Sequence, residues 1–150
     1  MTDEVVAPLS DPQGDPLVRL SWQATGVLAI VLLLGVVFVS PMAPVAAGVS
    51  LLMFAGGLVA FVAAYAIGVR RSRSEEVSVV GMFLLQGTAP KRIRHSFGWA
   101  ITAQTTLAVV AAVIRPFTTV AFGILAPTIG LGLMALWGAR NGEFPPRTRP

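Results

Sequence analysis

Four long apolar stretches divide this chain of 150 residues, and they limit what it can fold into. They cover about residues 22–40, 45–69, 97–114 and 117–137, and none contains Asp, Glu, His, Lys or Cys. Each is long enough to cross a hydrocarbon core of about 30 Å as a helix. Because lipid offers no partners for unpaired backbone groups, each stretch must be helical. The sequence therefore predicts an all-α membrane protein with four transmembrane helices arranged as two hairpins.

Lys and Arg are distributed unevenly between the segments that connect these helices. Ten of the eleven fall in the N-terminal tail, the loop 70–96 and the C-terminal tail, and only Arg115 falls on the other side. Short loops rich in Lys and Arg remain in the cytoplasm. We therefore expect a multi-pass protein of the bacterial plasma membrane with both termini cytoplasmic. The aromatic residues favoured at such an interface fit this orientation, one per helix: Trp22, Tyr65, Trp99 and Trp137.

Composition supports this prediction and argues against a soluble domain. The chain is 55% hydrophobic and 12% charged, whereas about a quarter of the residues in soluble domains are charged. It contains no cysteine, and its one histidine, His95, has basic neighbours, so we expect no metal site and no cofactor. The net charge is +4, and the basic residues responsible for it lie beside the apolar stretches. The expected partners are therefore anionic lipid head groups and not nucleic acid.

The segments outside the membrane domain, which is predicted over residues 21–140, are short. Residues 1–20 are acidic and proline-rich, which predicts a disordered cytoplasmic tail. Residues 141–150 are predicted to form a second cytoplasmic tail. Between the first two spans, Pro41 and Pro44 are expected to end the first helix.

The predicted cytoplasmic loop, residues 70–96, is the main candidate for contacts outside the bilayer. Its apolar segment Val77–Leu85 is too short to span a membrane. Ser72 and Glu75 resemble a capping box, which predicts a short helix that begins near Arg73 and lies in the membrane interface. The alternative is a docking site for a protein partner. The candidate lipid- or partner-contacting residues lie in two basic clusters on either side of this segment: Arg70, Arg71, Arg73, Lys91, Arg92 and Arg94.

Small residues recur every four positions along the second span. Such a stripe allows another helix backbone to come close, which is how helices gain contact in lipid. We expect it to pack within the chain against the first or third span, preferably against the alanine face of the third. The alternative is a homodimer or a partner subunit. The candidate helix-packing residues of this stripe are Gly56, Ala60, Ala64 and Gly68.

Gln104 and Pro127 are the two unusual residues within the predicted spans. The Gln104 side chain is strongly polar, so it should find an interhelical hydrogen-bond partner, or else contribute with nearby threonines to a polar path for a small solute. Pro127 removes a backbone donor and is expected to kink the fourth span, leaving the Gly123 carbonyl without its usual partner. Broken helices also line substrate sites in transporters, which is the alternative interpretation of Pro127.

The distribution of polar groups decides between the function classes. Catalysis within the membrane or ion-coupled transport would require an ionisable or nucleophilic group at depth, and the four stretches offer no acidic residue, histidine, lysine or cysteine. The sequence therefore predicts a non-catalytic protein, an accessory, scaffold or assembly subunit of a membrane complex. The alternative is a small oligomeric transporter or pore for an uncharged or small solute.

The overall layout and the sequence RIRHSFGW at residues 92–99 give one resemblance to a known group. The chain resembles small uncharacterised four-span integral membrane proteins of high-GC actinobacteria. This resemblance implies a four-helix membrane fold and carries no activity, cofactor or site residue with it.

Overall fold

The computed structural model describes residues 15–147, and the predictions about residues 1–14 and 148–150 lie outside this range. Between residues 15 and 147 the chain forms helices, turns and one isolated β-bridge, with no strand longer than that bridge. The helical elements are α1 Pro16–Val37, α2 Val39–Arg71, α3 Val79–Leu84, α4 Lys91–Ile114, the 3₁₀ helix η1 Thr119–Leu125 and α5 Thr128–Asn141.

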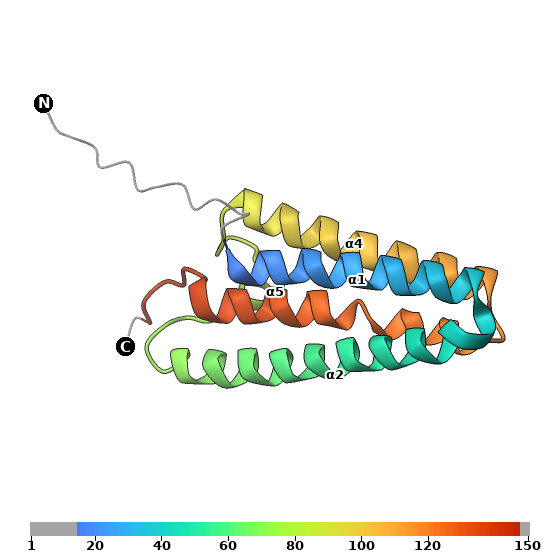
Figure 1. The fold of residues 1–150 in the computed structure, drawn as a ribbon. Coiled ribbons are helices and arrows are strands. Elements are labelled where there is room, and N and C mark those ends of the chain that lie inside the picture. The colour runs from blue at the N-terminus through green and yellow to red at the C-terminus, as the bar shows by residue number, and fades with distance from the viewer. Residues whose placement is uncertain (1–14, 148–150) are drawn as a thin grey trace, which may run out of the picture.

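The long helices run side by side in a bundle (Figure 1). The start of α1, the end of α2, the start of α4 and the end of α5 lie together, and we call this the basic end (Figure 1). The junction of α1 with α2 and the connection from α4 to η1 lie at the opposite end, the far end. Four helical segments are long and apolar enough to cross a membrane: Pro16–Val37, Val39–Arg71, Lys91–Ile114 and Thr119–Asn141. These segments indicate a multi-pass integral membrane protein.

The first two helices meet without the predicted loop. α1 ends at Val37, and Phe38, with φ −112° and ψ 67°, is the one residue between it and α2. The prediction that Pro41 and Pro44 end the first helix is wrong. Pro41 lies in the first turn of α2, where a backbone N–H has no intrahelical partner, and Pro44 lies inside the helix. Both prolines therefore lie in the second span and do not end the first.

Three helices begin six residues earlier than hydropathy predicts, and one of them is α2, which begins at Val39 and not at residue 45. α1 begins at Pro16 and not at residue 22, because the Asp15 carboxylate caps it by accepting from the backbone N–H groups of Leu17 and Val18. Residues 16–20, predicted as disordered tail, are thus helical. α4 begins at Lys91 and not at residue 97, so its basic cluster lies on a helix and not in a loop.

The fourth span is interrupted more widely than a proline kink predicts. Its first part is the 3₁₀ helix η1, and Pro127 is the N-cap of α5 at the junction between the two. The Gly123 carbonyl, predicted to lack a partner, accepts a hydrogen bond of 3.0 Å from the Ala126 backbone N–H. Hydrogen bonds between residues three apart, typical of a 3₁₀ helix, therefore pair the backbone carbonyl that an α-helix would have left without a donor at Pro127.

The helix α5 forms the centre of the bundle at the basic end. Nine of its fourteen residues are buried, and it contacts α1, α2, α3 and α4. A first cluster of buried apolar residues joins it to α1 through Val18 and to α4 through Phe97. A second joins it to α2 and α3 through Ala64, Met82 and Ala135. A third cluster, around Leu28, Leu32 and Val120, fills the far end.

The connection between α2 and α4 differs from its prediction. The short helix α3 begins at Val79 and not near Arg73, and its N-cap is Ser78, whose side chain accepts from the Gly81 N–H at 3.0 Å. Met82 on α3 is buried against the bundle. The capping box predicted at Ser72 and Glu75 does not form, because Glu75 pairs instead with Arg71.

The first residues after α5 are ordered, contrary to the predicted tail. Residues 142–147, the C-terminal strap, run antiparallel to residues 74–76 and form a β-bridge between Glu75 and Pro146. The Glu76 N–H donates to the Pro145 carbonyl, and the Arg147 N–H donates to the Ser74 carbonyl, each at 2.9 Å. The strap therefore ties the end of α5 to the end of α2.

Candidate functional site

A polar cluster of Ser21, Thr25 and Gln104 lies between α1 and α4. The Gln104 side chain is fully buried, and its amide nitrogen donates to the Thr25 hydroxyl at 2.9 Å and to the Ser21 carbonyl at 3.3 Å. The Thr25 hydroxyl in turn donates to the Ser21 carbonyl at 2.9 Å. The predicted interhelical hydrogen bond of Gln104 is thus confirmed. Sequence reasoning missed its partners, although Ser21 and Thr25 are spaced one helical turn apart.

Two oxygen atoms of this cluster have no hydrogen-bond partner among residues 15–147. They are the Ser21 hydroxyl and the Gln104 carbonyl Oε1. Gly130 of α5 packs closely on Gln104, since a β-carbon added at Gly130 would lie 2.9 Å from Oε1. The three threonines near Gln104 in sequence do not join the cluster, because all three are exposed on the outside of α4: Thr102, Thr105 and Thr106.

The small residues of α2 pack within the chain, but not against the predicted partner. Ala60 and Ala64 contact Ala135 and neighbouring residues of α5, so the predicted contact with the third span is wrong. The closest approach involves Gly57 and not Gly56: a β-carbon at Gly57 would lie 2.5 Å from the Thr128 carbonyl group, whereas one at Gly56 would meet only the end of the Ile129 side chain. Gly68, the last residue of the stripe, accommodates the Met82 sulfur of α3.

On the α5 side of this contact, Gly132 faces Gly57 directly. A β-carbon at Gly132 would collide with the Gly57 carbonyl oxygen. Backbone therefore meets backbone at this crossing, which small residues permit. The alanine face predicted on α4 also packs within the chain: Ala100 and Ala108 are buried, while α4 lies against α1, η1 and α5.

Arg71, predicted to contact lipid or a partner, is committed to contacts within the chain. Its guanidinium pairs with Glu75 at 2.7 Å and donates to the backbone carbonyls of Ala139 and Gly142, each at 2.9 Å. It also lies 5.0 Å from the centre of the Phe144 ring. The last carbonyls of a helix lack intrahelical partners, so Arg71 caps the end of α5 from a different helix.

The other candidate basic residues remain at the surface of the basic end. Arg70, Arg73, Lys91 and Arg92 are exposed, and Arg94 is half-buried. No ion pair involves them within residues 15–147, where the Arg71–Glu75 pair is the one salt bridge. These residues could attract anions such as lipid head groups.

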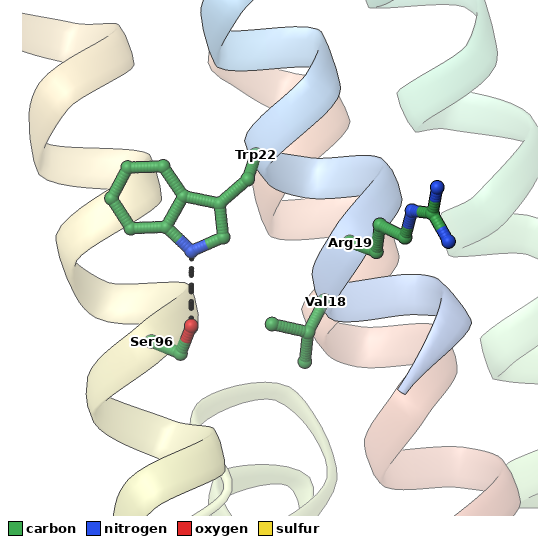
Figure 2. Close-up of a pocket in the computed structure, with 4 residues that line it drawn as sticks. All are labelled: Val18, Arg19, Trp22 and Ser96. Atoms are coloured by element: carbon green, nitrogen blue, oxygen red, sulfur yellow. Dashed lines mark hydrogen bonds between the residues drawn. The ribbon is translucent and has the colours of Figure 1, made fainter. Parts of the chain in front are cut away.

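The aromatic residues of the basic end differ in exposure. Trp22 reaches from α1 to α4 and donates to the Ser96 hydroxyl at 3.0 Å, beside a cavity of about 530 Å³ (Figure 2). The Arg19 guanidinium, which also borders this cavity, points away from Ser96 (Figure 2). Trp99 is 67% exposed, but Trp137 is only 5% exposed and donates to the Asp15 carboxylate. Trp137 is therefore a core residue and not an interfacial one.

The far end holds one basic side chain, Arg115. Its guanidinium donates twice to the Val36 carbonyl, at 3.1 and 3.2 Å, near the end of α1. The solitary arginine on this side is thus explained as a cap for a neighbouring helix, which its position in the sequence does not reveal.

Comparison with known proteins adds no relative: no family model matches the chain, and neither the curated proteins nor the solved structures contain a match. The candidate site therefore rests on geometry. It consists of an amide and hydroxyl cluster within the bundle and a basic surface at one end, and it offers binding by charge and hydrogen bonds.

Proposed function

We propose that this protein is a non-catalytic integral membrane protein that serves as an accessory, scaffold or assembly subunit of a membrane complex. Its four spans form two hairpins in the bacterial plasma membrane, with both termini in the cytoplasm. Anionic lipid head groups surround its cytoplasmic end, and a membrane protein partner or a second copy completes the assembly.

This proposal rests mainly on the hydrogen bonds that polar side chains form between helices of the bundle. The Gln104 amide, the Arg71 guanidinium and the Arg115 guanidinium each bind backbone or side-chain groups of another helix. Such groups are consistent with a rigid scaffold, because their donors are occupied within the fold. The basic end supports the cytoplasmic orientation, since positively charged loops are retained in the cytoplasm.

Native purification tests this proposal. The chain is extracted from its own membranes in a mild detergent, and the subunit ratio of any co-eluting protein is determined. A partner at a fixed ratio is expected, and liposomes containing the purified chain alone should not leak small solutes. A uniform homo-oligomer that makes liposomes permeable would contradict the accessory role.

The unpaired atoms of the polar cluster favour one second candidate, a small oligomeric transporter or pore. Gln104 Oε1 and Ser21 Oγ are buried acceptors that a polar solute could use, and they lie beside the interrupted fourth span. In this case Gln104→Leu should abolish solute flux through liposomes without changing the oligomeric state. A flux that survives Gln104→Leu would exclude this path.

A further inference from the structure

One face of α4 changes in chemical character along its length. Starting at the basic end, residues at offsets 0, 3, 4, 7, 8 and 11 share a side of the helix. Amine and guanidinium groups come first, with an imidazole, then an aromatic ring beside a glycine, and then a hydroxyl. We call this the graded face; its residues are Lys91, Arg94, His95, Gly98, Trp99 and Thr102.

The graded face borders an open cavity between α4 and α5. The cavity has a volume of about 650 Å³ and is lined by five of these residues together with Met134 of α5. Gly98 lines this cavity without a side chain, and the space beside it is open, since a β-carbon added there would have no other atom within 4 Å; we call this space the recess. Within residues 15–147, the Lys91 and Arg94 side chains form no ion pair that would neutralise them.

Beyond Thr102, toward the far end, Thr105 and Thr106 follow on the exposed side of α4, and after them this side is apolar. Val109 and Val113 continue the heptad spacing toward the far end, and both are open to the surroundings. From Thr102 to Val113 the helix rises by about 16 Å, at about 1.5 Å per residue. This is close to the depth of one leaflet, about half of a bilayer core of about 30 Å.

We propose that the graded face binds one anionic phospholipid. Arg94 and Lys91 hold the phosphate and the second anionic group of the head, Trp99 lies at the glycerol level, and the Thr102 hydroxyl donates to an ester carbonyl. One acyl chain lies along the valines. The order of charge, aromatic ring, hydroxyl and apolar surface matches this molecule from head to tail, which is the complementarity that selects it over a protein partner.

This inference depends on the proposed membrane insertion, and tryptophan quenching separates the two. The full chain carries three tryptophans, so the variant Trp22→Phe leaves Trp99 exposed and Trp137 buried. It is reconstituted in vesicles that contain phosphatidylglycerol or phosphatidylcholine with brominated acyl chains at equal mole fractions. Quenching by brominated phosphatidylcholine reports contact with the bilayer. Stronger quenching by brominated phosphatidylglycerol reports the site.

Two substitutions in this background should remove the preference for phosphatidylglycerol. Arg94→Gln deletes one guanidinium and should reduce the preference about fivefold, the effect of one basic contact near an anionic lipid. Gly98→Leu keeps the charge and fills the recess. It should therefore reduce the preference for phosphatidylglycerol to the level produced by general attraction between the basic end and an anionic membrane. Unchanged helicity shows that each variant is folded.

Matched controls carry the same changes elsewhere. Arg92→Gln removes one guanidinium from the same helical turn but another side of α4, and Gly26→Leu fills an equally open position on α1. Both should retain the preference. The site is excluded if phosphatidylglycerol quenches no more than phosphatidylcholine, if Arg92→Gln acts like Arg94→Gln, or if Gly98→Leu has no effect. If neither brominated lipid quenches the tryptophan fluorescence, the proposed membrane insertion is overturned as well.

Discussion

The Gln104 amide and the Thr25 hydroxyl form a hydrogen bond of 2.9 Å that joins two helices 79 residues apart in the sequence. The Thr25 hydroxyl in turn donates a hydrogen bond to the Ser21 carbonyl, so the donors of both side chains are used. On the opposite side of the amide, Gly130 of α5 approaches the Gln104 carbonyl oxygen. Three helices therefore meet at one buried glutamine.

We expect Gly130→Ala to destabilise the protein through this contact. The new β-carbon would lie 2.8 Å from Ile101 Cγ1 and 2.9 Å from Gln104 Oε1, and such overpacking costs about 1–3 kcal/mol. Part of this cost should disappear in a Gln104→Ala background, where the amide is absent. Denaturant titration in detergent micelles measures the free energies of unfolding for the cycle. Strict additivity of the two substitutions would show that they do not interact.

A substitution at the crossing of α2 with α5 should destabilise the protein even more. Gly57→Ala places a β-carbon 2.5 Å from the Thr128 carbonyl, and because backbone cannot move aside as a side chain can, we expect a loss of more than about 3 kcal/mol. Gly48→Ala, on the same helix, meets no atom within 4 Å and should stabilise it by about 1 kcal/mol through helix propensity. Thermal unfolding in micelles compares the two. Similar effects at both positions would contradict the close crossing.

The sequence predicts those features of this fold that depend on local chemistry. The number of spans follows from hydropathy, because a long apolar stretch has one stable form in lipid. The pairing of Gln104 follows from the cost of burying an amide, whichever helix supplies the partner. The first residue of a helix does not follow from hydropathy. α1 begins at Pro16 because Asp15 caps it, and a hydropathy average contains no information about a cap.

The relations between distant segments could not be read from the sequence. A stripe of small residues shows that a helix will come close but does not identify it, and the choice of α5 depends on the packing of the whole bundle. Gly56 and Gly57 are adjacent, and only the rotation of α2 decides that Gly57 faces the crossing. Arg71 resembles Arg70 in the sequence, yet only Arg71 lies where the carbonyls of α5 end.

This difference between neighbouring arginines gives a third prediction. Arg71→Gln removes the bonds to Ala139 and Gly142, and we expect a loss of about 1–2 kcal/mol, since the guanidinium is 24% exposed and solvent weakens its ion pair. The C-terminal strap should also become sensitive to protease after Asn141. Limited proteolysis with mass spectrometry measures this directly.

Arg70→Gln is the matched control for that experiment, because Arg70 is exposed and adjacent. Its stability and its cleavage pattern should equal those of the unchanged protein. If both variants release the strap to the same extent, general charge and not the specific contacts of Arg71 would hold it.

The absence of cysteine makes the orientation testable in the full chain by single substitutions. Phe117 is 100% exposed at the far end, and Gln86 is exposed in the connection after α3 at the basic end. With the basic end in the cytoplasm, a membrane-impermeant maleimide should label Phe117→Cys in intact cells, and should label Gln86→Cys only after permeabilisation. Glu143→Cys, at an exposed position within the strap, should behave like Gln86→Cys. Labelling of Gln86→Cys and Glu143→Cys in intact cells, with Phe117→Cys protected, would reverse the orientation and place the graded face of α4 in the outer leaflet.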